Sequence, residues 1–235
     1  MADRKFSAIL AAGGSGTRFG GEINKVYLPL GGQTVIEASL DKLLNHPLIA
    51  EVIVVYRKED EAVLMPILAE KGTGSAVPLL AVPGGETRRD SVRRGLALVS
   101  SGRVLVHDAA RPFWDPAWID ALAEALDEVP GASAAVPSPD TVKITDERGR
   151  VVMTTERSRT WLVQTPQVFK TELYRACAYV ALKDRITVTD DASVAEHAGF
   201  KVTPVDCGRE NIKITSPLDF TIAEAIIAER ERENG

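Results

Sequence analysis

A glycine-rich stretch near the amino terminus, together with two basic residues, has the chemistry needed to bind an anion. It reads A-A-G-G-S-G-T-R over residues 11–18, and Lys25 follows Arg18 after six intervening residues. Small residues leave backbone N–H groups unshielded, so that a polyanion can approach the main chain closely. The guanidinium and the ammonium could then face the same anion. The pattern predicts a phosphate-binding loop whose backbone cradle comprises Ala11, Ala12, Gly13, Gly14 and Gly16.

The spacing of these glycines excludes two familiar phosphate motifs. The dinucleotide fingerprint G-x-G-x-x-G could begin at Gly14 and use Gly16, but its third glycine would fall on Phe19. The pattern G-x-x-x-x-G-K-[ST] could use Gly16 and Gly21, but Glu22 stands where its lysine belongs. A surface turn with solvated basic residues is the alternative that the loop alone leaves open.

Short apolar runs alternate with amphipathic segments along the chain and would position this loop. The runs are expected to be strands at 6–12, 52–56, 79–82, 104–107, 134–136 and 201–205. The amphipathic segments are expected to be helices at 35–44, 59–70, 88–99, 116–128, 170–183, 190–198 and 217–231. Strands that are apolar throughout suit a parallel sheet covered on both faces. We therefore predict an α/β fold with a doubly wound, mostly parallel sheet, and the loop follows its first strand.

Residues 141–155 interrupt this alternation. They alternate with period two around a polar D-E-R-G-R turn, which is typical of a β-hairpin. The apolar side chains of Val142, Ile144, Val151 and Met153 must then be buried against the same domain or another subunit. We find no long linker or repeat, so we expect one domain over 1–235 with a projecting β-arm at 138–157.

Charge and composition exclude several classes of protein. A formal net charge of -5 argues against a dedicated nucleic-acid-binding protein. No apolar stretch approaches the ~20 residues of a membrane span, and the first apolar run is too short for a signal peptide. We expect a soluble, cytoplasmic protein without a membrane or nucleic-acid partner. The two cysteines form no CxxC pair and the three histidines are scattered, so no metal cluster is expected from them.

Some conspicuous side chains have simple structural interpretations. His107 ends an apolar run and is expected to be a hydrogen-bonded core residue rather than a base. Trp114 and Trp118 are four residues apart and would pack on one helix face. Arg88 could reach a phosphate, but solvation or an ion pair is at least equally expected.

Eight short stretches, including residues 11–18, follow one another along the chain in an order that resembles a known family. The other seven are G-G-E-T-R-R-D-S-V (84–92), H-D-A-A-R-P (107–112), D-T-V-K (140–143), T-T-E-R (154–157), Q-T-P-Q-x-F (164–169), T-D-D-A-S (189–193) and N-I-K-I-T (211–215). Each is weak alone, but together they are specific. They resemble the 2-C-methyl-D-erythritol 4-phosphate cytidylyltransferases of the non-mevalonate isoprenoid pathway. The resemblance implies transfer of CMP from CTP to a small polyol phosphate, with Mg²⁺ or another divalent cation.

The resemblance also implies roles for individual residues. The catalytic cations would be Arg18, Lys25, Arg157 and Lys213. Besides the backbone cradle, the nucleotide would contact Gly85, Ser91, Asp108 and Ala109, with Asp108 also near the metal. The acceptor would contact Thr141, Arg157, Thr165, Thr189, Lys213 and Arg111, although Arg111 could instead simply neutralise Asp108.

In the family that the chain resembles, the arm crosses into a partner subunit, which implies a homodimer with arm exchange. Thr141 and Arg157 would then complete the acceptor site of the neighbouring subunit.

Three positions depart from the family pattern. Asn24 and Val26 flank Lys25 where proline and glutamine are common, and Glu210 stands where aspartate is usual. Without the proline, the loop is expected to be less ordered before CTP binds. The longer Glu210 side chain affects the expected contacts to the acceptor hydroxyls.

Two other functions remain open from the sequence. A ribitol 5-phosphate cytidylyltransferase would share the loop, CTP and Mg²⁺, but tends to carry a bulkier residue at the position of Ala110. A catalytically silent nucleotide-binding regulator could have the same fold. Retention of the four cations argues against the regulator.

Overall fold

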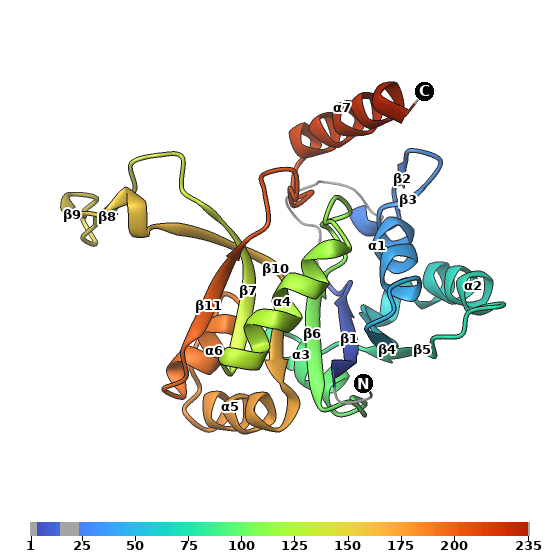
Figure 1. Ribbon diagram of the computed structural model, residues 1–235, viewed down its shortest axis with the longest axis horizontal. Coiled ribbons are helices and arrows are strands. Elements are labelled where there is room, and N and C mark those ends of the chain that lie inside the picture. The colour runs from blue at the N-terminus through green and yellow to red at the C-terminus, as the bar shows by residue number, and fades with distance from the viewer. Residues whose placement is uncertain (1–3, 15–23, 235) are drawn as a thin grey trace.

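A seven-stranded sheet forms the centre of the computed structural model, which describes residues 4–14 and 24–234 (Figure 1). The strand order is β11-β7-β10-β6-β1-β4-β5, and β10 runs antiparallel to both of its neighbours while the other pairs are parallel. The strands are β1 (Phe6–Ala11), β4 (Ile49–Tyr56), β5 (Leu79–Pro83), β6 (Arg103–Asp108), β7 (Gly131–Pro137), β10 (Trp161–Lys170) and β11 (Val202–Asp206). The predicted mostly parallel α/β fold is confirmed.

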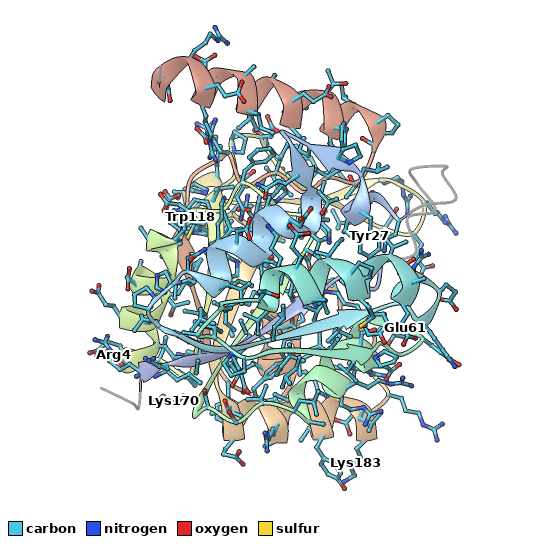
Figure 2. All side chains as sticks on the ribbon, turned by 90° about the vertical axis from the view of Figure 1, so that its right-hand side faces the viewer. Arg4, Tyr27, Glu61, Trp118, Lys170 and Lys183 are labelled. Atoms are coloured by element: carbon cyan, nitrogen blue, oxygen red, sulfur yellow. The ribbon has the colours of Figure 1, made fainter. Side chains whose placement is uncertain are left out.

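Helices cover both faces of this sheet. One face packs against α1 (Val35–Leu44), α2 (Glu61–Gly72) and α4 (Ala117–Glu128). The other packs against α3 (Arg88–Leu96), α5 (Thr171–Lys183) and α6 (Asp191–His197). Side chains fill both layers, with Glu61 on α2 and Lys183 on α5 at the outer surfaces (Figure 2).

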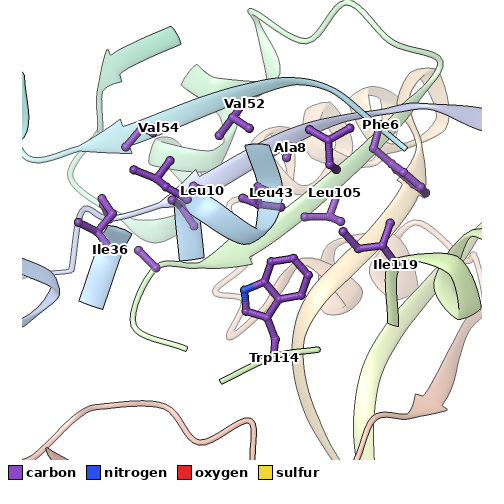
Figure 3. Packing of buried hydrophobic residues seen from close by; sticks show 14 of the residues in the cluster. Phe6, Ala8, Leu10, Ile36, Leu43, Val52, Val54, Leu105, Trp114 and Ile119 are labelled. Atoms are coloured by element: carbon purple, nitrogen blue, oxygen red, sulfur yellow. The ribbon is translucent and has the colours of Figure 1, made fainter. Parts of the chain in front are cut away.

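The two layers explain why the strands are apolar at every position. In β1, Ala8 and Leu10 belong to the core under α1 and α4, where Leu43 and Trp114 also lie (Figure 3). Ile9 points to the opposite core under α3 and α5. Successive residues of a strand face opposite sides, so each strand must be apolar throughout when both sides are buried.

The carboxyl ends of β1 and β6 lie at the point where the strand order reverses. After β1 the chain adds β4 and β5 on one side, and it then returns to place β6 on the other side. A crevice opens outside the strand ends at such a reversal, and α/β proteins bind ligands there. The topology therefore positions the residues that follow Ala11 and Asp108 at one site.

A third apolar cluster lies beside the sheet. It brings Leu30, Val35, Phe113 and Ile214 together with Ala223 of α7 (Pro217–Asn234). A short hairpin, β2 (Pro29–Leu30) with β3 (Gln33–Thr34), leads into α1. Thr34 and Glu37 then form a reciprocal capping box that starts α1 at the predicted residue.

Two expectations about local structure were wrong or incomplete. Trp114 does not share a helix with Trp118, because α4 begins at Ala117, directly after Pro116. A residue before proline is disfavoured in the helical region, so the helix cannot extend back through Asp115. The long strand β10 was not predicted, because Pro166 interrupts its sequence; the structure accommodates this proline where the pairing to β7 breaks between Val163 and Gln167.

The predicted arm is a hairpin of β8 (Lys143–Thr145) and β9 (Val151–Thr154), followed by the 3₁₀ turn η5 (Arg157–Arg159). It projects away from the sheet (Figure 1). Ile144, Val151 and Met153 keep 43%, 58% and 51% of their surface exposed. Within one chain, these apolar side chains are not buried.

Candidate active site

A pocket of about 330 Å³ lies at the carboxyl ends of β1 and β6. Its lining residues are Ala11, Ala12, Gly13, Gly14, Asn24, Lys25, Val26, Gly85, Glu86, Thr87, Arg88, Ser91, Asp108, Ala110 and Lys213. All but three come from four of the eight stretches, and the other three are Asn24, Lys25 and Val26. The fold thus gathers at one point residues that are up to two hundred positions apart.

One wall of the pocket consists of the chain ends that flank residues 15–23. Gly13 and Gly14 follow the end of β1 in the chain. Lys25 is the first residue of the 3₁₀ turn η3 (Lys25–Tyr27), and its side chain is largely buried. The predicted residues Gly16 and Arg18 lie outside the described part of the chain, as does the loop expected to be less ordered. For the described residues, the predicted backbone cradle and its lysine do line one pocket.

Another part of the pocket wall is the start of α3. Thr87 caps this helix by accepting a hydrogen bond from the backbone N–H of Asp90 at 3.1 Å. The Ser91 hydroxyl accepts a hydrogen bond from the Gly85 N–H at 3.1 Å. A Cβ added to Gly85 would lie 2.5 Å from the Cβ of Asp90, so only glycine allows this close approach. Gly85 and Ser91 therefore lie together in the pocket wall, and their contact with the nucleotide remains a prediction.

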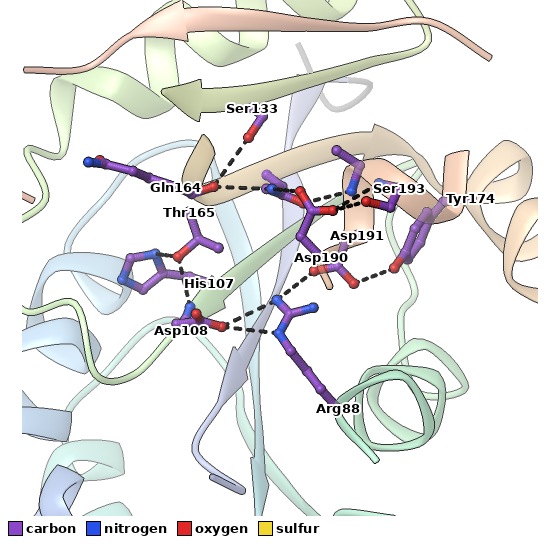
Figure 4. A network of polar contacts seen from close by, with 12 residues as sticks. Arg88, His107, Asp108, Ser133, Gln164, Thr165, Tyr174, Asp190, Asp191 and Ser193 are labelled. Carbon is purple, nitrogen blue, oxygen red and sulfur yellow. Dashed lines mark hydrogen bonds and ion pairs between the residues drawn. The ribbon is translucent and has the colours of Figure 1, made fainter. Parts of the chain in front are cut away.

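Asp108 lines the pocket and contacts two cations, one of which, Arg88, is visible in Figure 4. The Lys213 ammonium donates to its Oδ2 at 2.6 Å, and Nη2 of Arg88 donates to its Oδ1 at 3.2 Å. Burial by itself would raise the pKa of this carboxyl, but the nearby Arg88, Lys213 and Arg111 outweigh burial and hold that pKa well below its usual range. Asp108 is therefore an ionised group throughout the physiological pH range.

Arg88 connects this carboxylate to a second, fully buried acidic residue. Its Nη2 lies 2.7 Å from Oδ2 of Asp191, and the Tyr174 hydroxyl donates to Oδ1 of Asp191 at 2.5 Å (Figure 4). Burial disfavours a charged guanidinium, yet the two carboxylates raise the pKa of Arg88 above its ordinary value. Arg88 thus makes the expected ion pairs and also lines the pocket.

The residues expected around the acceptor lie at several distances from this pocket. Lys213 is in it. Thr165 is buried behind Asp108, and its hydroxyl accepts the Asp108 N–H at 3.0 Å. Arg111 is mostly buried and donates from Nη1 to the carbonyl of Asn211 at 2.7 Å. Thr189 is exposed beside the cap of α6.

Thr141 and Arg157 are exposed on the projecting arm. One chain therefore does not bring them to Lys213.

The sequence pattern of the 2-C-methyl-D-erythritol 4-phosphate cytidylyltransferase family matches residues 6–229. This chain belongs to that family. It is 39% identical over 224 residues to the 2-C-methyl-D-erythritol 4-phosphate cytidylyltransferase of Prochlorococcus marinus, a match that covers 94% of this chain and 98% of the relative. Identity to the corresponding protein of Pelotomaculum thermopropionicum is 38% over 229 residues, covering 97% and 96% of the two chains.

A solved structure has the same architecture. The 4-diphosphocytidyl-2C-methyl-D-erythritol synthase of Anaerococcus prevotii superposes with a TM-score of 0.86 at 34% identity, covering 97% of this chain and 98% of that one. Family membership makes this chain a cytidylyltransferase, as the eight stretches implied. Among the described residues, no helix is long and apolar enough to span a bilayer.

Several pocket residues of the cytidylyltransferase were not predicted as site residues. Asn24 and Val26 were noted only as departures from the family pattern. Glu86 and Thr87 lie in the matched stretch 84–92, in which only Gly85 and Ser91 had been assigned a role. Ala110 was used only to distinguish two acceptors. These residues could have been predicted from their position next to assigned residues, because consecutive residues at a strand end or helix start line the same surface.

His107 is the core residue that was predicted, and it gives the cytidylyltransferase a specific pH dependence. Its Nε2 lies 3.1 Å from the Arg111 carbonyl and its Nδ1 lies 3.1 Å from the Thr165 hydroxyl. The carbonyl can only accept, so Nε2 carries the proton and Nδ1 accepts from Thr165. Burial lowers the pKa of His107 to about 3.

Lowering the pH from 7 to 5 should destabilise the cytidylyltransferase through His107. The unfolded chain protonates this histidine below about pH 6.5 while the folded protein keeps it neutral, so unfolding takes up a proton. The free energy of unfolding should therefore fall by about 2 kcal/mol more in the wild type than in His107→Gln over this interval. Urea denaturation of both proteins at pH 5, 6 and 7 measures the difference. An equal pH dependence in the two proteins would contradict a neutral folded-state histidine.

Proposed function

We propose that this chain transfers the CMP group of CTP to 2-C-methyl-D-erythritol 4-phosphate and releases pyrophosphate. The observation that carries this proposal is the single pocket that gathers the backbone of residues 11–14, Lys25, Asp108 and Lys213. Relatives with this reaction in their names match nearly the whole chain. The product would be 4-diphosphocytidyl-2-C-methyl-D-erythritol.

The reaction joins two anions, and the pocket residues address that problem. An oxygen of the acceptor phosphate attacks the α-phosphorus of CTP, a new P–O bond forms, and the bond to the leaving pyrophosphate breaks. Such transfers depend on positioning and charge stabilisation rather than on covalent help from the protein. In our proposal, the residue 11–14 backbone and Lys25 hold the triphosphate, and Lys213 meets the acceptor phosphate. Arg18 and Arg157 would supply further positive charge.

The carboxylate of Asp108 fits a metal ion that arrives with its substrate. Among the described residues, no group of three or more His, Cys, Asp or Glu side chains could form a complete metal site. Mg²⁺ commonly binds through one or two carboxylates, substrate phosphates and water, which matches a single pocket carboxylate. When bound, such an ion would neutralise charge on the phosphates. Asp108 would hold it and also orient Lys213 through their 2.6 Å contact.

The start of α3 is suited to reading the base. The Gly85 N–H is bonded to the Ser91 hydroxyl, and Gly85 packs closely against Asp90. A rigid set of donors and acceptors discriminates cytosine from uracil, because uracil reverses the hydrogen-bonding pattern at N3 and at position 4. Ala109, buried and bonded through its N–H to the Ala11 carbonyl at 3.0 Å, would support the ribose side.

The arm would complete the acceptor site of a second copy of the chain. Its apolar side chains are exposed, which is expected of a segment that is buried only on association. Thr141 and Arg157 would then reach the neighbouring subunit's acceptor, together with that subunit's Thr189, Arg111 and Thr165. This arrangement makes the active form a homodimer.

A turnover assay tests the substrate assignment. Purified protein with CTP and Mg²⁺ should release pyrophosphate faster with 2-C-methyl-D-erythritol 4-phosphate than with ribitol 5-phosphate. Ala110 lines the pocket at the position where ribitol 5-phosphate cytidylyltransferases tend to carry a bulkier residue. Faster turnover of ribitol 5-phosphate would overturn the acceptor assignment. Binding of CTP without pyrophosphate release from either acceptor would indicate a silent regulator.

A further inference from the structure

Asn24 joins the two chain ends that form the phosphate side of the pocket. Its side chain is 2% exposed, and Nδ2 donates to the Ala12 carbonyl at 3.0 Å and to Oδ2 of Asp60 at 3.0 Å. Both amide hydrogens are therefore used. The Oδ1 atom accepts a longer bond from the Val26 N–H at 3.4 Å and caps the turn that begins at Lys25.

Asp60 fixes which way this amide points. Arg57 donates to both of its carboxylate oxygens, from Nε at 2.8 Å and from Nη2 at 2.5 Å. A carboxylate that is clamped in this way can only accept, so the NH₂ group of Asn24 must face it. The two-donor group is the only part of the side chain that can satisfy Asp60 and the Ala12 carbonyl together. Asn24 lines the pocket, and all three members of the cluster of Arg57, Asp60 and Asn24 are buried or half-buried.

The contacts of Asn24 also set the position of its neighbour in the sequence. Its carbonyl accepts the Tyr27 N–H at 2.9 Å, so Asn24 bonds to the second and third residues of the η3 turn that carries Lys25. On the other side, Ala12 is tied to the sheet by its own N–H, which donates to the Val55 carbonyl at 2.8 Å. A short chain of hydrogen bonds thus runs from the sheet through Ala12 to Asn24, and from Asn24 to Val26 and Tyr27 in the turn that begins at Lys25.

We propose that Asn24 is a positioning residue that fixes Lys25 relative to the backbone cradle at residues 12–14. The inference rests on the proposed role of Lys25 in stabilising the transition state. A misplacement of about 1 Å is enough to reduce a rate by about 10²-fold. Asn24 acts through Lys25 and contacts no substrate through its side-chain amide, because both amide hydrogens are already bonded within the protein.

A double-mutant cycle tests this role. Asn24→Ala should lower kcat by about 10-fold or more and change the KM for CTP by less than about threefold, since a positioned charge matters most in the transition state. In a Lys25→Ala background the same substitution should change kcat by less than about twofold, because the residue through which it acts is absent. Asn24→Ser retains a cap and one donor, so it should restore part of the lost activity.

Stability measurements separate this role from a merely structural one. Ser7→Ala is the matched control, because Ser7 is also a fully buried polar residue. It lies near the start of β1, away from the pocket at the carboxyl end of that strand, and bonds to Glu51. The substitution should lower the melting temperature without lowering kcat. Should Asn24→Ala fail to fold, the Asn24→Ser variant supplies the same cycle.

The possible outcomes distinguish the two proposals. A Lys25→Ala enzyme with wild-type kcat would overturn the role of Lys25 and this inference with it. If Lys25→Ala is slow but Asn24→Ala lowers kcat equally in that background, the positioning role of Asn24 is overturned and the role of Lys25 stands. Wild-type kcat in Asn24→Ala would do the same.

Discussion

Lys25→Ala is expected to lower kcat by about 10²-fold or more, with a smaller effect on the KM for CTP. Lys25 is held in a buried turn and lines the same pocket as Asp108 and Lys213. A fixed, largely buried charge stabilises the developing charge on the triphosphate more strongly than a solvated charge could. Its removal therefore weakens transition-state binding more than ground-state binding.

Steady-state pyrophosphate release at saturating substrates measures this effect. Lys183→Ala is a suitable control, because Lys183 is exposed on α5, which covers one face of the sheet (Figure 2). It should leave kcat unchanged. Arg18→Ala is expected to have a loss of similar size, because the family resemblance gives Arg18 the same role toward the triphosphate. Wild-type kcat in Lys25→Ala or in Arg18→Ala would remove that residue from the mechanism.

Mixing two inactive variants is expected to restore activity. Arg157→Ala subunits retain Lys25 but carry a defective arm, whereas Lys25→Ala subunits retain the arm but carry a defective pocket. If arms are exchanged, each mixed dimer contains one pocket with an intact lysine and an intact arm, and one site with both defects. Random pairing of equal amounts makes half of the dimers mixed, so about a quarter of all sites should be active.

The mixing experiment needs subunits that can redistribute. The two variants should be unfolded and refolded together, or expressed together, and compared with the same amounts refolded separately. A separately refolded pair that is combined just before the assay should stay inactive. Activity no greater than the sum of the two separate variants would place Arg157 with the pocket of its own chain.

The sequence alone predicted most elements of the sheet, because a strand buried on both faces must be apolar at every residue. It also located the start of α1, where Thr34 and Glu37 satisfy the free N–H groups of the first turn. The backbone cradle was recognisable for a similar local reason, since glycines after a strand expose their N–H groups. In each case the signal lies within a few consecutive residues.

Only the tertiary structure could show which distant groups meet. Lys213 pairs with Asp108 across 105 positions, because the segment after β11 returns to the end of β6, where the Ile214 N–H donates to the Ala110 carbonyl at 2.9 Å. Asp191 reaches Arg88 across a comparable distance, because the start of α6 is held against β10, where Gln167 accepts the Ala192 N–H at 2.8 Å. The strand β10 could not be predicted for a related reason. Its sequence contains a proline, and it is stabilised by pairing with β6 and β7, which are distant in sequence.

Asn24 shows the same division between local pattern and folded structure. In the sequence, Asn24 is only a departure from the family pattern next to Lys25. In the fold, its amide bonds to both Ala12 and Asp60, and no local sequence pattern connects these three residues. The sequence thus determined the elements and the kinds of charge at the site. The fold determined which charges are paired, buried and held in place, because burial and pairing depend on contacts between distant segments.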